Sequence, residues 1–572
     1  MMARAQHTVH ALRAGQAGDA GAAAAVPEAT ARLPARLRRK RRWAAPLLVT
    51  LLLAQMAGAM VTTAVRQTPT IDEPVYVATA TDYLREHRLR YNLEHPPLGK
   101  LLIAAGVAVA GPRYDPSYSG TQGEVGRHLL YESGNDPGRL MLWARLPVIG
   151  LTLLFGLVVF AFARDLTGTA GGPVALALYS FDPDVIAHGA LATLDVPAAG
   201  FVLTSAWLVR RARHRPLRYL PLAGAALGAA VATKMSTLPA VPVLMVLAAV
   251  SVGTARRGAD RPRRVLGGLA GAAVVALTAV MVVWAAYLAV DPHLRFAPAG
   301  PVPAVHGLRG RLTGLLPLPR AYREGMRVQF GLEGQPWQGY LFGRVYTGSL
   351  WYYLPAALLV KTPLGLLALG AAGAVAVLGV RRLRPAAPYL LLPPAVLLAA
   401  AMTGSRNFGT RYALFVPMFL AVAAACVPRL RWRWPWATGV TAALALFVVV
   451  SSLRAFPYYL PYANEAFGGP AHTHRLLHDS NVDWGQDLGR LAGRLRTRYR
   501  GQRVWLVYKG SGVPSFYGIH AADPREVPLD QVHGLLAVSD SSAAKARGKL
   551  AELIDSSRPV GQVGYSITLY RR

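Results

Sequence analysis

Directly after its first apolar run, the chain reads TPTIDEPVYVATATDYLREHRLRYNLEHPPLGK (residues 68–100). The adjacent carboxylates Asp72 and Glu73 precede Pro74, which suits the first turn of a helix, so one of the two should occupy the N-cap. The run HPPLGK (95–100) opens a second, more apolar helix that is too short to cross a bilayer. This stretch therefore predicts two short helices that lie in the membrane interface.

The composition is that of a membrane protein with many spans. Of the 572 residues, 53% are hydrophobic and only 16% are charged. The net charge of +33 comes from short basic clusters between apolar runs, a pattern that is typical of cytoplasmic loops and predicts no nucleic-acid partner. Cys426 is the only cysteine, which excludes disulfides within the chain and cysteine-based metal sites.

The apolar runs predict about eleven transmembrane helices, because roughly 20 apolar residues cross the hydrocarbon core. The predicted spans are 44–65, 146–163, 170–187, 194–209, 217–233, 237–253, 265–290, 352–379, 386–402, 410–427 and 434–453. Residues 1–43 are predicted to be a disordered basic tail. We expect no secretory signal peptide there, since the first run is long enough to span and has no cleavage site behind it.

The basic clusters predict one orientation of the chain in the membrane. With the tail in the cytoplasm, every strongly basic loop falls on the cytoplasmic side, as the positive-inside rule requires. These loops hold Arg164 and the runs 210–218, 255–264, 381–384 and 429–433. The sequence therefore predicts a multi-pass protein of the plasma or inner membrane, with a cytoplasmic N-terminus and an extracytoplasmic C-terminus.

Three larger segments fall on the outer side in this topology. They are loops 66–145 and 291–350 of a membrane domain at 44–454, and a terminal part at 455–572. The terminal part has strand-like runs at 504–510 and 534–540 and a helical run at 487–499. The predicted fold class is mainly α, with interfacial helices in the first outer loop and a small C-terminal α/β domain.

Asp72 and Lys100 each have two interpretations. A lone aspartate before a helix is usually a cap, and a lone lysine at a membrane surface is usually an anchor. At headgroup depth, however, the carboxylate of Asp72 can act as a base and the ammonium of Lys100 can meet a lipid phosphate. Their occurrence in one outer loop favours a functional site.

A second polar group interrupts the predicted third and fourth spans. Asp182, Asp184, His188 and Asp195 stand in YSFDPDVIAHGALATLDVPAAG (179–200). Ionisable groups at such positions are costly and usually face a cavity or mark a site. The aspartates could equally form turns and caps beside the neighbouring prolines, so both interpretations stay open.

Several cations also fall at the outer side or inside the membrane. They are Arg145, Lys234, Lys361 in LVKTPLG, and Arg411 in SRNFGTRYALFVP. Together they can receive an anionic headgroup, although each alone could be an interfacial anchor. Further along, His472, His474, His478 and Asp479 lack a diagnostic ligand spacing, so a packed surface segment is favoured over a metal site.

Taken together, the motifs resemble the protein O-mannosyltransferase superfamily. They are the acidic pair, HPPLGK, AHGALATLDVPAAG (187–200), KTP (361–363), NFGTRYALFVP (407–417) and DSNVDWGQDL (479–488). These multispanning GT-C glycosyltransferases use polyprenyl-phosphate sugars, and they include aminoarabinose transferases and bacterial members labelled family 39. The resemblance runs from about residue 44 to 490, and the second outer loop lacks an obvious MIR-type insertion.

The resemblance implies roles for particular residues. Asp72 matches the catalytic aspartate with Glu73 beside it, and Asp195 matches a further acidic residue of the outer cavity. By the same resemblance, Arg145 matches an arginine of the second span and Lys100 is a ligand of the donor phosphate. With Arg145 and Lys100, the outer cations Lys234 and Arg411 complete the candidate phosphate ligands, and His95 and His188 are candidates for lining the acceptor site or cavity. Asp72 and Glu73 together could hold a divalent metal ion, and the motifs indicate no other cofactor.

The sequence therefore predicts an inverting membrane glycosyltransferase. A sugar on a lipid monophosphate already has a good leaving group, so one carboxylate that takes the acceptor's proton suffices. The resemblance implies a hexose, specifically mannose, and an extracytoplasmic acceptor hydroxyl on a protein Ser/Thr, a glycan or a lipid. The alternative is a transporter or flippase for an anionic lipid-linked substrate, which has little use for a carboxylate outside the bilayer. The intact acidic pair argues against a catalytically dead scaffold.

Overall fold

The computed structural model describes residues 35–572 apart from 257, 259, 297, 299 and 431–436, with side chains from residue 44 onward except at 308 and 312. Most of the predicted tail, residues 1–34, lies outside the described residues. Helix α1 (Ala35–Arg66) begins before the predicted first span. Residues 48–572 form one compact unit, to which the following description applies.

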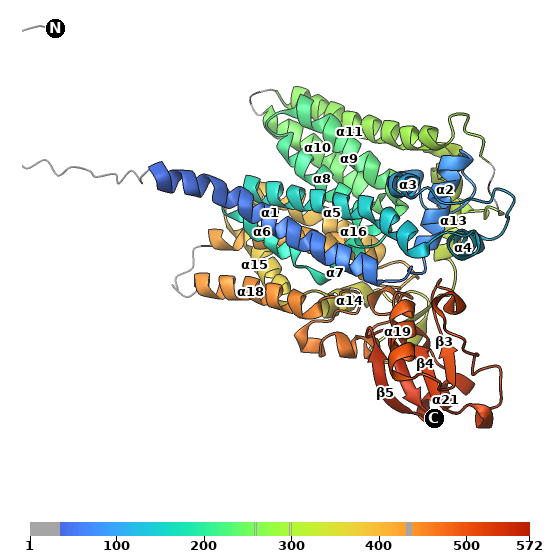
Figure 1. Cartoon of the computed structure of the whole chain (residues 1–572). Helices are drawn as coiled ribbons and strands as arrows, with labels where there is room; N and C mark the ends of the chain where they lie inside the picture. Colours follow the sequence, from blue (N-terminus) through green and yellow to red (C-terminus); the bar gives the residue numbers. More distant parts are fainter. Residues whose placement is uncertain (1–34, 257, 259, 297, 299, 431–436) are drawn as a thin grey trace, which may run out of the picture. The chain divides into compact units, whose positions relative to one another are not determined.

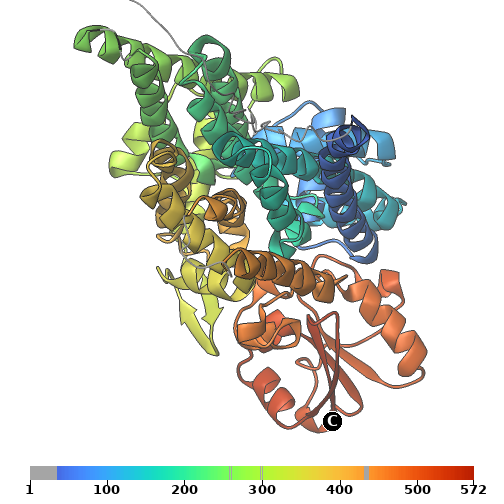
Figure 2. The ribbon, with the colours of Figure 1, turned by 90° about the vertical axis from the view of Figure 1, so that its left-hand side faces the viewer.

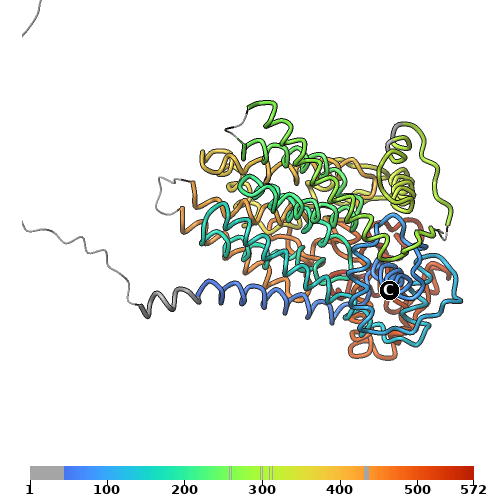
Figure 3. The backbone as a smooth tube through the Cα atoms, turned by 90° about the horizontal axis from the view of Figure 1, so that it is seen from above, coloured from blue at the N-terminus to red at the C-terminus, as the bar shows by residue number. Residues whose placement is uncertain are grey.

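Within this unit, long apolar helices run side by side (Figures 1 and 3). Five described helices are long and apolar enough to cross a membrane: Ala44–Arg66, α5 (Pro137–Thr167), α11 (Arg261–Val290), Arg384–Ala401, which contains α16 (Ala387–Ala401), and α18 (Ala437–Ala455). The multi-pass, mainly helical architecture is therefore confirmed, whereas the total of eleven spans stays a prediction. The other predicted spans correspond to shorter or less apolar helices: α6 (Gly171–Ser180), α7 (Pro183–Gly189), α8 (Asp195–Arg211), α9 (Pro216–Thr233), α10 (Ala240–Ala255) and α17 (Phe415–Ala424).

The predicted span 352–379 is not one continuous helix. It consists of α14 (Tyr353–Lys361) and α15 (Leu364–Gly379), which meet at an angle of 117°. Pro363 precedes α15 directly; it has no N–H for the helical ladder and keeps Thr362 extended. The KTP motif thus marks a sharp bend, which apolar length alone does not reveal.

The three segments that the predicted topology places outside gather at one end of the long helices (Figure 1). The first outer loop forms α2 (Glu73–Arg85), α3 (Pro97–Ala110) and α4 (Gln122–Arg127), so both helices expected from the prolines are present. The second forms α12 (Gly307–Leu315), α13 (Arg320–Glu333) and an antiparallel hairpin of β1 (Gln338–Leu341) and β2 (Arg344–Thr347).

The terminal part contains a four-stranded sheet in the order β3-β4-β6-β5 (Figures 1 and 2). The strands are β3 (Val504–Val507), β4 (Leu535–Ser539), β5 (Arg558–Val563) and β6 (Ile567–Arg571), accompanied by α19 (Leu488–Arg498), α20 (Asp540–Ala543) and α21 (Lys549–Asp555). β3 and β4 are parallel, and residues 508–534 form the long crossover connection that such a pair needs, whereas the other pairs are antiparallel. The predicted strands and helix are present, while a separate domain beginning at residue 455 stays a prediction.

The close approach of α3 to α5 can be tested at Gly106. A Cβ added at Gly106 would lie 1.8 Å from the carbonyl oxygen of Trp143 in α5, so Gly106→Ala must push the two helices apart. We expect a loss of roughly 1–3 kcal/mol, the usual cost of overpacking, measured by thermal unfolding in detergent. Gly58→Ala in α1 is the matched control, because nothing lies within 4 Å of its added Cβ. Equal stability of the two variants would contradict this packing.

Candidate active site

The two adjacent carboxylates point into different surroundings. Glu73, the first residue of α2, is fully buried and receives a fork of two hydrogen bonds from Arg145 of α5. Arg145 Nε donates to Glu73 Oε1 and Nη2 donates to Oε2, both at 2.7 Å. The backbone N–H groups of Thr70 and Ala192 donate to the same carboxylate at 2.9 and 2.8 Å. Glu73 therefore has no free oxygen to offer a substrate.

Arg145 is bonded to the protein interior by all of its donor groups. Besides Glu73, it donates to the carbonyl oxygens of Ala64, Gln67 and Thr68 at 2.5, 3.0 and 3.3 Å. Its predicted part in phosphate binding does not fit this position, because its donors already face the protein interior. Burial alone would raise the pKa of Glu73, but the charge and hydrogen bonds of Arg145 hold it below its ordinary value of 4.5.

Asp72 occupies the N-cap position of α2, yet its side chain makes no capping hydrogen bond within the described residues. Its Oδ2 instead accepts a hydrogen bond from Arg411 Nη1. The Asp72 side chain remains 27% exposed, whereas that of Arg411 is only 7% exposed. The capping interpretation is therefore wrong for the side chain, which faces a cavity.

Arg411 lies in a short helix (Thr410–Ala413) between two aromatic rings. Its Cζ is 5.0 Å from the ring centroid of Tyr412 and 4.5 Å from that of Trp484. Both distances suit cation–π attraction, which confines the guanidinium beside Asp72.

Asp72 and Arg411 line a cavity of about 540 Å³. Its charged lining combines the carboxylates Asp72, Glu94 and Glu333 with the cations Lys234, Arg309, Arg406 and Arg411. Part of the lining comes from the second half of α13, and further lining residues come from segments at 234–239 and 397–415. A cavity with several cations and one accessible aspartate suits an anionic, hydroxyl-bearing ligand.

Asp195 and Lys234 form a second ion pair next to this cavity. Asp195 opens α8, and one of its oxygens accepts a hydrogen bond from Lys234 Nζ. Lys234 also lies 4.8 Å from the ring centroid of Tyr412. A small neighbouring pocket is lined by Asp195, Lys234, Arg411 and Tyr412, so the two acidic positions share their cations.

Of the two predicted site residues His95 and Lys100, only His95 lines the cavity. His95 lines the cavity, and burial together with the charge of Lys234 holds its pKa well below 6.5, so its ring is neutral there. Lys100 is fully buried and donates to the carbonyl oxygens of Asn92 and His95, each at 2.7 Å. Burial lowers the pKa of Lys100 to about 7. Lys100 thus supports the loop that carries His95, rather than lining the cavity as a phosphate ligand would.

His188 also lies away from the cavity. It is fully buried in α7, and neither ring nitrogen has a hydrogen-bond partner among the described residues. His188 Nε2 lies 3.8 Å from Asp184 Oδ1, and the same oxygen lies 3.6 Å from Lys361 Nζ. Asp182 caps α7, so the turn interpretation holds for this aspartate.

Residues 479–487, here called the brace segment, join the distant motifs. Lys361 Nζ donates to the carbonyl oxygens of Leu460 and Asn481 at 2.5 and 3.0 Å. Asn481 Oδ1 accepts from the N–H of Thr410, next to Arg411, at 3.0 Å. The KTP, NFGTRY and DSNVDWGQDL motifs therefore meet in one place.

The metal predictions stay open, but the donor set does not favour them. In the part of the chain that the structure describes, no group of three His, Cys, Asp or Glu side chains could hold a metal ion. Asp72 and Glu73 do not converge, because the Glu73 oxygens are already bonded to Arg145. Near the histidine run, Asp479 pairs with Lys509, whose charge helps to hold the Asp479 pKa at about 2 despite burial.

Sequence reasoning missed several residues of the site. Glu94, Arg309, Glu333, Arg406 and Tyr412 line the cavity, and the ring of Trp484 lies against Arg411. Three of them stand beside residues that were singled out: Glu94 before His95, and Arg406 and Tyr412 around NFGTR. Their proximity to known candidates was the available signal, whereas nothing local to Trp484 indicates that its ring faces Arg411.

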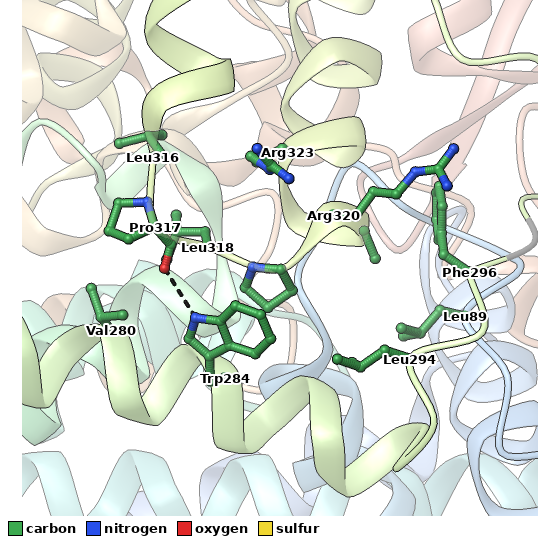
Figure 4. Close-up of a pocket in the computed structure, with 12 residues that line it drawn as sticks. Leu89, Val280, Trp284, Leu294, Phe296, Leu316, Pro317, Leu318, Arg320 and Arg323 are labelled. Atoms are coloured by element: carbon green, nitrogen blue, oxygen red, sulfur yellow. Dashed lines mark hydrogen bonds between the residues drawn. The ribbon is translucent and has the colours of Figure 1, made fainter.

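A second, mostly apolar pocket of about 650 Å³ lies against α11 (Figure 4). Val280 and Trp284 of α11 form its floor, and Trp284 Nε1 donates to the carbonyl oxygen of Pro317 at 3.0 Å. Arg320 and Arg323, in the first turn of α13, stand at this pocket. Helix α13 therefore borders both pockets, the apolar one with its first turn and the charged one with its second half.

Comparison with known proteins identifies the membrane part. Residues 49–291 match the family described as dolichyl-phosphate-mannose-protein mannosyltransferase. This match confirms the resemblance seen in the motifs, and the protein is a glycosyltransferase. Among curated proteins, none matches the chain.

Solved structures with a similar course of the chain include three transferases. ArnT from Cupriavidus metallidurans in the apo state is 14% identical, covering 92% of this chain and 98% of that chain, with a TM-score of 0.46. The S. cerevisiae protein O-mannosyltransferase Pmt1-Pmt2 complex bound to the sugar donor is 18% identical over 42% of this chain and 33% of that chain, with a TM-score of 0.31. The archaeal oligosaccharyltransferase AglB from Archaeoglobus fulgidus is 13% identical over 73% and 55%, with a TM-score of 0.39. Because these TM-scores are low, no residue role is taken from these structures.

The Glu73–Arg145 pair can be tested through stability. Glu73→Gln leaves the buried guanidinium without its counter-charge, so we expect a loss of about 3–5 kcal/mol in the free energy of unfolding. Glu132→Gln, which breaks a solvent-exposed pair with Arg127, should change little. Because the folded pKa of Glu73 is depressed, its stabilisation is full above pH 4.5 and is lost as the pH falls through the folded pKa. Equal unfolding of both variants would contradict the structural role.

Proposed function

We propose that the protein transfers a hexose, specifically mannose, from a polyprenyl-phosphate carrier to an acceptor hydroxyl on the outer side of the cell membrane. The observation that carries this proposal is the accessible Asp72 beside Arg411 at a cavity with several cations. The family match names a dolichyl-phosphate-mannose donor, which agrees with such a cavity. The acceptor is a protein Ser/Thr, a glycan or a lipid.

Asp72 acts as the general base in this mechanism. Its carboxylate takes the proton from the acceptor hydroxyl while the hydroxyl oxygen attacks the anomeric carbon. The bond from that carbon to the phosphate oxygen breaks, the polyprenyl phosphate leaves with both electrons, and the anomeric centre is inverted. Arg411, Lys234 and Arg406 line the cavity and would stabilise the phosphate charge. Asp195 would hold Lys234 in place for this task.

The apolar pocket against α11 would receive part of the isoprenoid chain. Its lining is largely aliphatic and aromatic, and α11 carries the exposed apolar side chains Leu277, Met281 and Leu288. The chain would then run along α13 towards the phosphate in the charged cavity. Arg320 and Arg323 would stay near the headgroup layer, where cations meet lipid phosphates.

The catalytic assignment is tested with Asp72→Asn. The amide cannot accept the hydroxyl proton, so we expect transfer to fall by about 10²–10⁴-fold while expression and membrane insertion persist. The assay incubates membranes with labelled polyprenyl-phosphate sugars and follows which sugar is consumed and onto which acceptor. Asp115→Asn, an aspartate at the surface of the same outer loop, should keep full activity. Unchanged transfer by Asp72→Asn would exclude this mechanism.

The lipid pocket is tested by filling it. Val280→Trp places a large ring in the pocket, so we expect KM to rise several-fold for a long-chain donor and to stay unchanged for a short-chain donor. Val274→Trp is the matched control on the same helix, because Val274 is 37% exposed and lies outside the pocket lining. An equal change in KM for both donors would argue against chain binding here.

A further inference from the structure

We infer that Trp484 is a positioning residue of the transfer reaction and that the terminal part of the chain thereby belongs to the active site. Trp484 acts through Arg411, whose guanidinium it holds against Asp72. This inference rests on the proposed function, since it concerns the same carboxylate. It gives the terminal part of the chain a function that the sequence motifs did not indicate.

Trp484 touches both partners of the site through different atoms. Its ring centroid is 4.5 Å from Arg411 Cζ, and its carbonyl oxygen accepts a hydrogen bond from the N–H of Ile71 at 3.0 Å. Ile71 directly precedes Asp72 in the chain. One residue therefore sets the position of the carboxylate by its backbone and the position of the guanidinium by its side chain.

Few hydrogen bonds fix the guanidinium group of Arg411. Nη1 donates to Asp72, Nη2 donates to the Tyr412 hydroxyl at 3.3 Å, and Nε has no hydrogen-bond partner within the described residues. An arginine side chain has many rotamers, and fixing them costs free energy. The flat indole face, at the shorter of the two ring distances, restricts this freedom without taking up a donor.

Trp484 is itself fixed by the brace segment. It is 1% exposed, and its N–H donates to Gln486 Oε1 at 2.8 Å. The carbonyl oxygens of Gly485 and Gln486 receive hydrogen bonds from Thr68, at 3.1 Å from its hydroxyl and 3.0 Å from its N–H. The brace segment thus runs beside the residues that lead into Asp72.

The terminal sheet holds the brace segment from the other side. Tyr508, just after β3, donates its hydroxyl to the carbonyl oxygen of Gly485 at 2.8 Å. The N–H of Ser541, just after β4, donates to Asp483 Oδ2 at 3.1 Å. The sheet therefore positions Trp484, and Trp484 positions Arg411 and Asp72.

If Trp484 has this role, its substitution lowers kcat even when kcat is expressed per folded enzyme. Trp484→Leu removes the aromatic face, so we expect kcat per folded enzyme to fall about tenfold or more, within the range of cation–π and ordering effects. Trp484→Phe keeps an aromatic face and should keep most of the activity. Trp484→Met, with an unbranched apolar side chain of similar reach, should behave like Trp484→Leu and serves if the leucine variant does not fold.

Phe162→Leu is the control. Phe162 is a fully buried aromatic residue of α5, roughly 25 Å along the helix from Arg145, and it belongs neither to the cavity lining nor to the brace segment or the terminal sheet. Both leucine variants should lose thermal stability, whereas only Trp484→Leu should lose kcat. The measurements are thermal unfolding in detergent, and kcat and KM for a labelled polyprenyl-phosphate sugar, corrected for folded protein.

The outcomes separate this inference from the proposed function. Equal kcat of the Trp484→Leu and Phe162→Leu enzymes, or a Trp484→Phe enzyme as inactive as Trp484→Leu, would overturn the positioning role. If Asp72→Asn is inactive while Trp484→Leu is fully active, only the role of Trp484 fails. An active Asp72→Asn enzyme would instead remove the proposed function itself.

Discussion

The buried ion pair between Glu73 and Arg145 is the constraint on which the site depends. Both charges are out of water, and such a pair is tolerated only when each donor and acceptor is satisfied. Arg145 meets this condition by bonding Glu73 and three carbonyl oxygens near the end of α1. Successive residues of a helix point about 100° apart. With Glu73 directed into the core, its neighbour Asp72 can face the cavity.

The brace segment provides the second constraint. It links segments near residues 68, 361 and 410, and each of these links is a hydrogen bond that involves a backbone group. Lys361 at the bend between α14 and α15 donates to Asn481, and Asn481 in turn accepts from Thr410 beside Arg411. Sequence motifs that look like separate signatures therefore describe one connected structure around Asp72.

Two cations of the site each contact both an aspartate and the cavity. Arg411 pairs with Asp72 and Lys234 pairs with Asp195, while both cations also line the cavity. A phosphate entering the cavity would find positive charge already desolvated and held in place, which strengthens its interaction. Helix α13 reaches from this charged cavity to the apolar pocket, matching a ligand with an anionic head and an apolar chain.

Local sequence determined the features that depend on neighbouring residues. Pro74 and the prolines of HPPLGK set the starts of α2 and α3, the apolar runs indicated a multi-pass helical protein, and short strand-like runs marked β3 and β4. The position of Asp72 at the start of a helix was also readable. These properties follow from backbone preferences and hydrophobic length, which act over a few residues.

Only the tertiary structure decided what each charged side chain does. Lys100 and Arg145 were expected to bind phosphate, yet both are buried and bonded to carbonyl groups, whereas Trp484 meets Arg411 across a wide sequence separation. The role of an ionisable group depends on its burial and on the partner that reaches it. Such partners come from distant segments that packing brings together. The sequence therefore determined which positions carry charge, and the fold determined which of these side chains face the cavity.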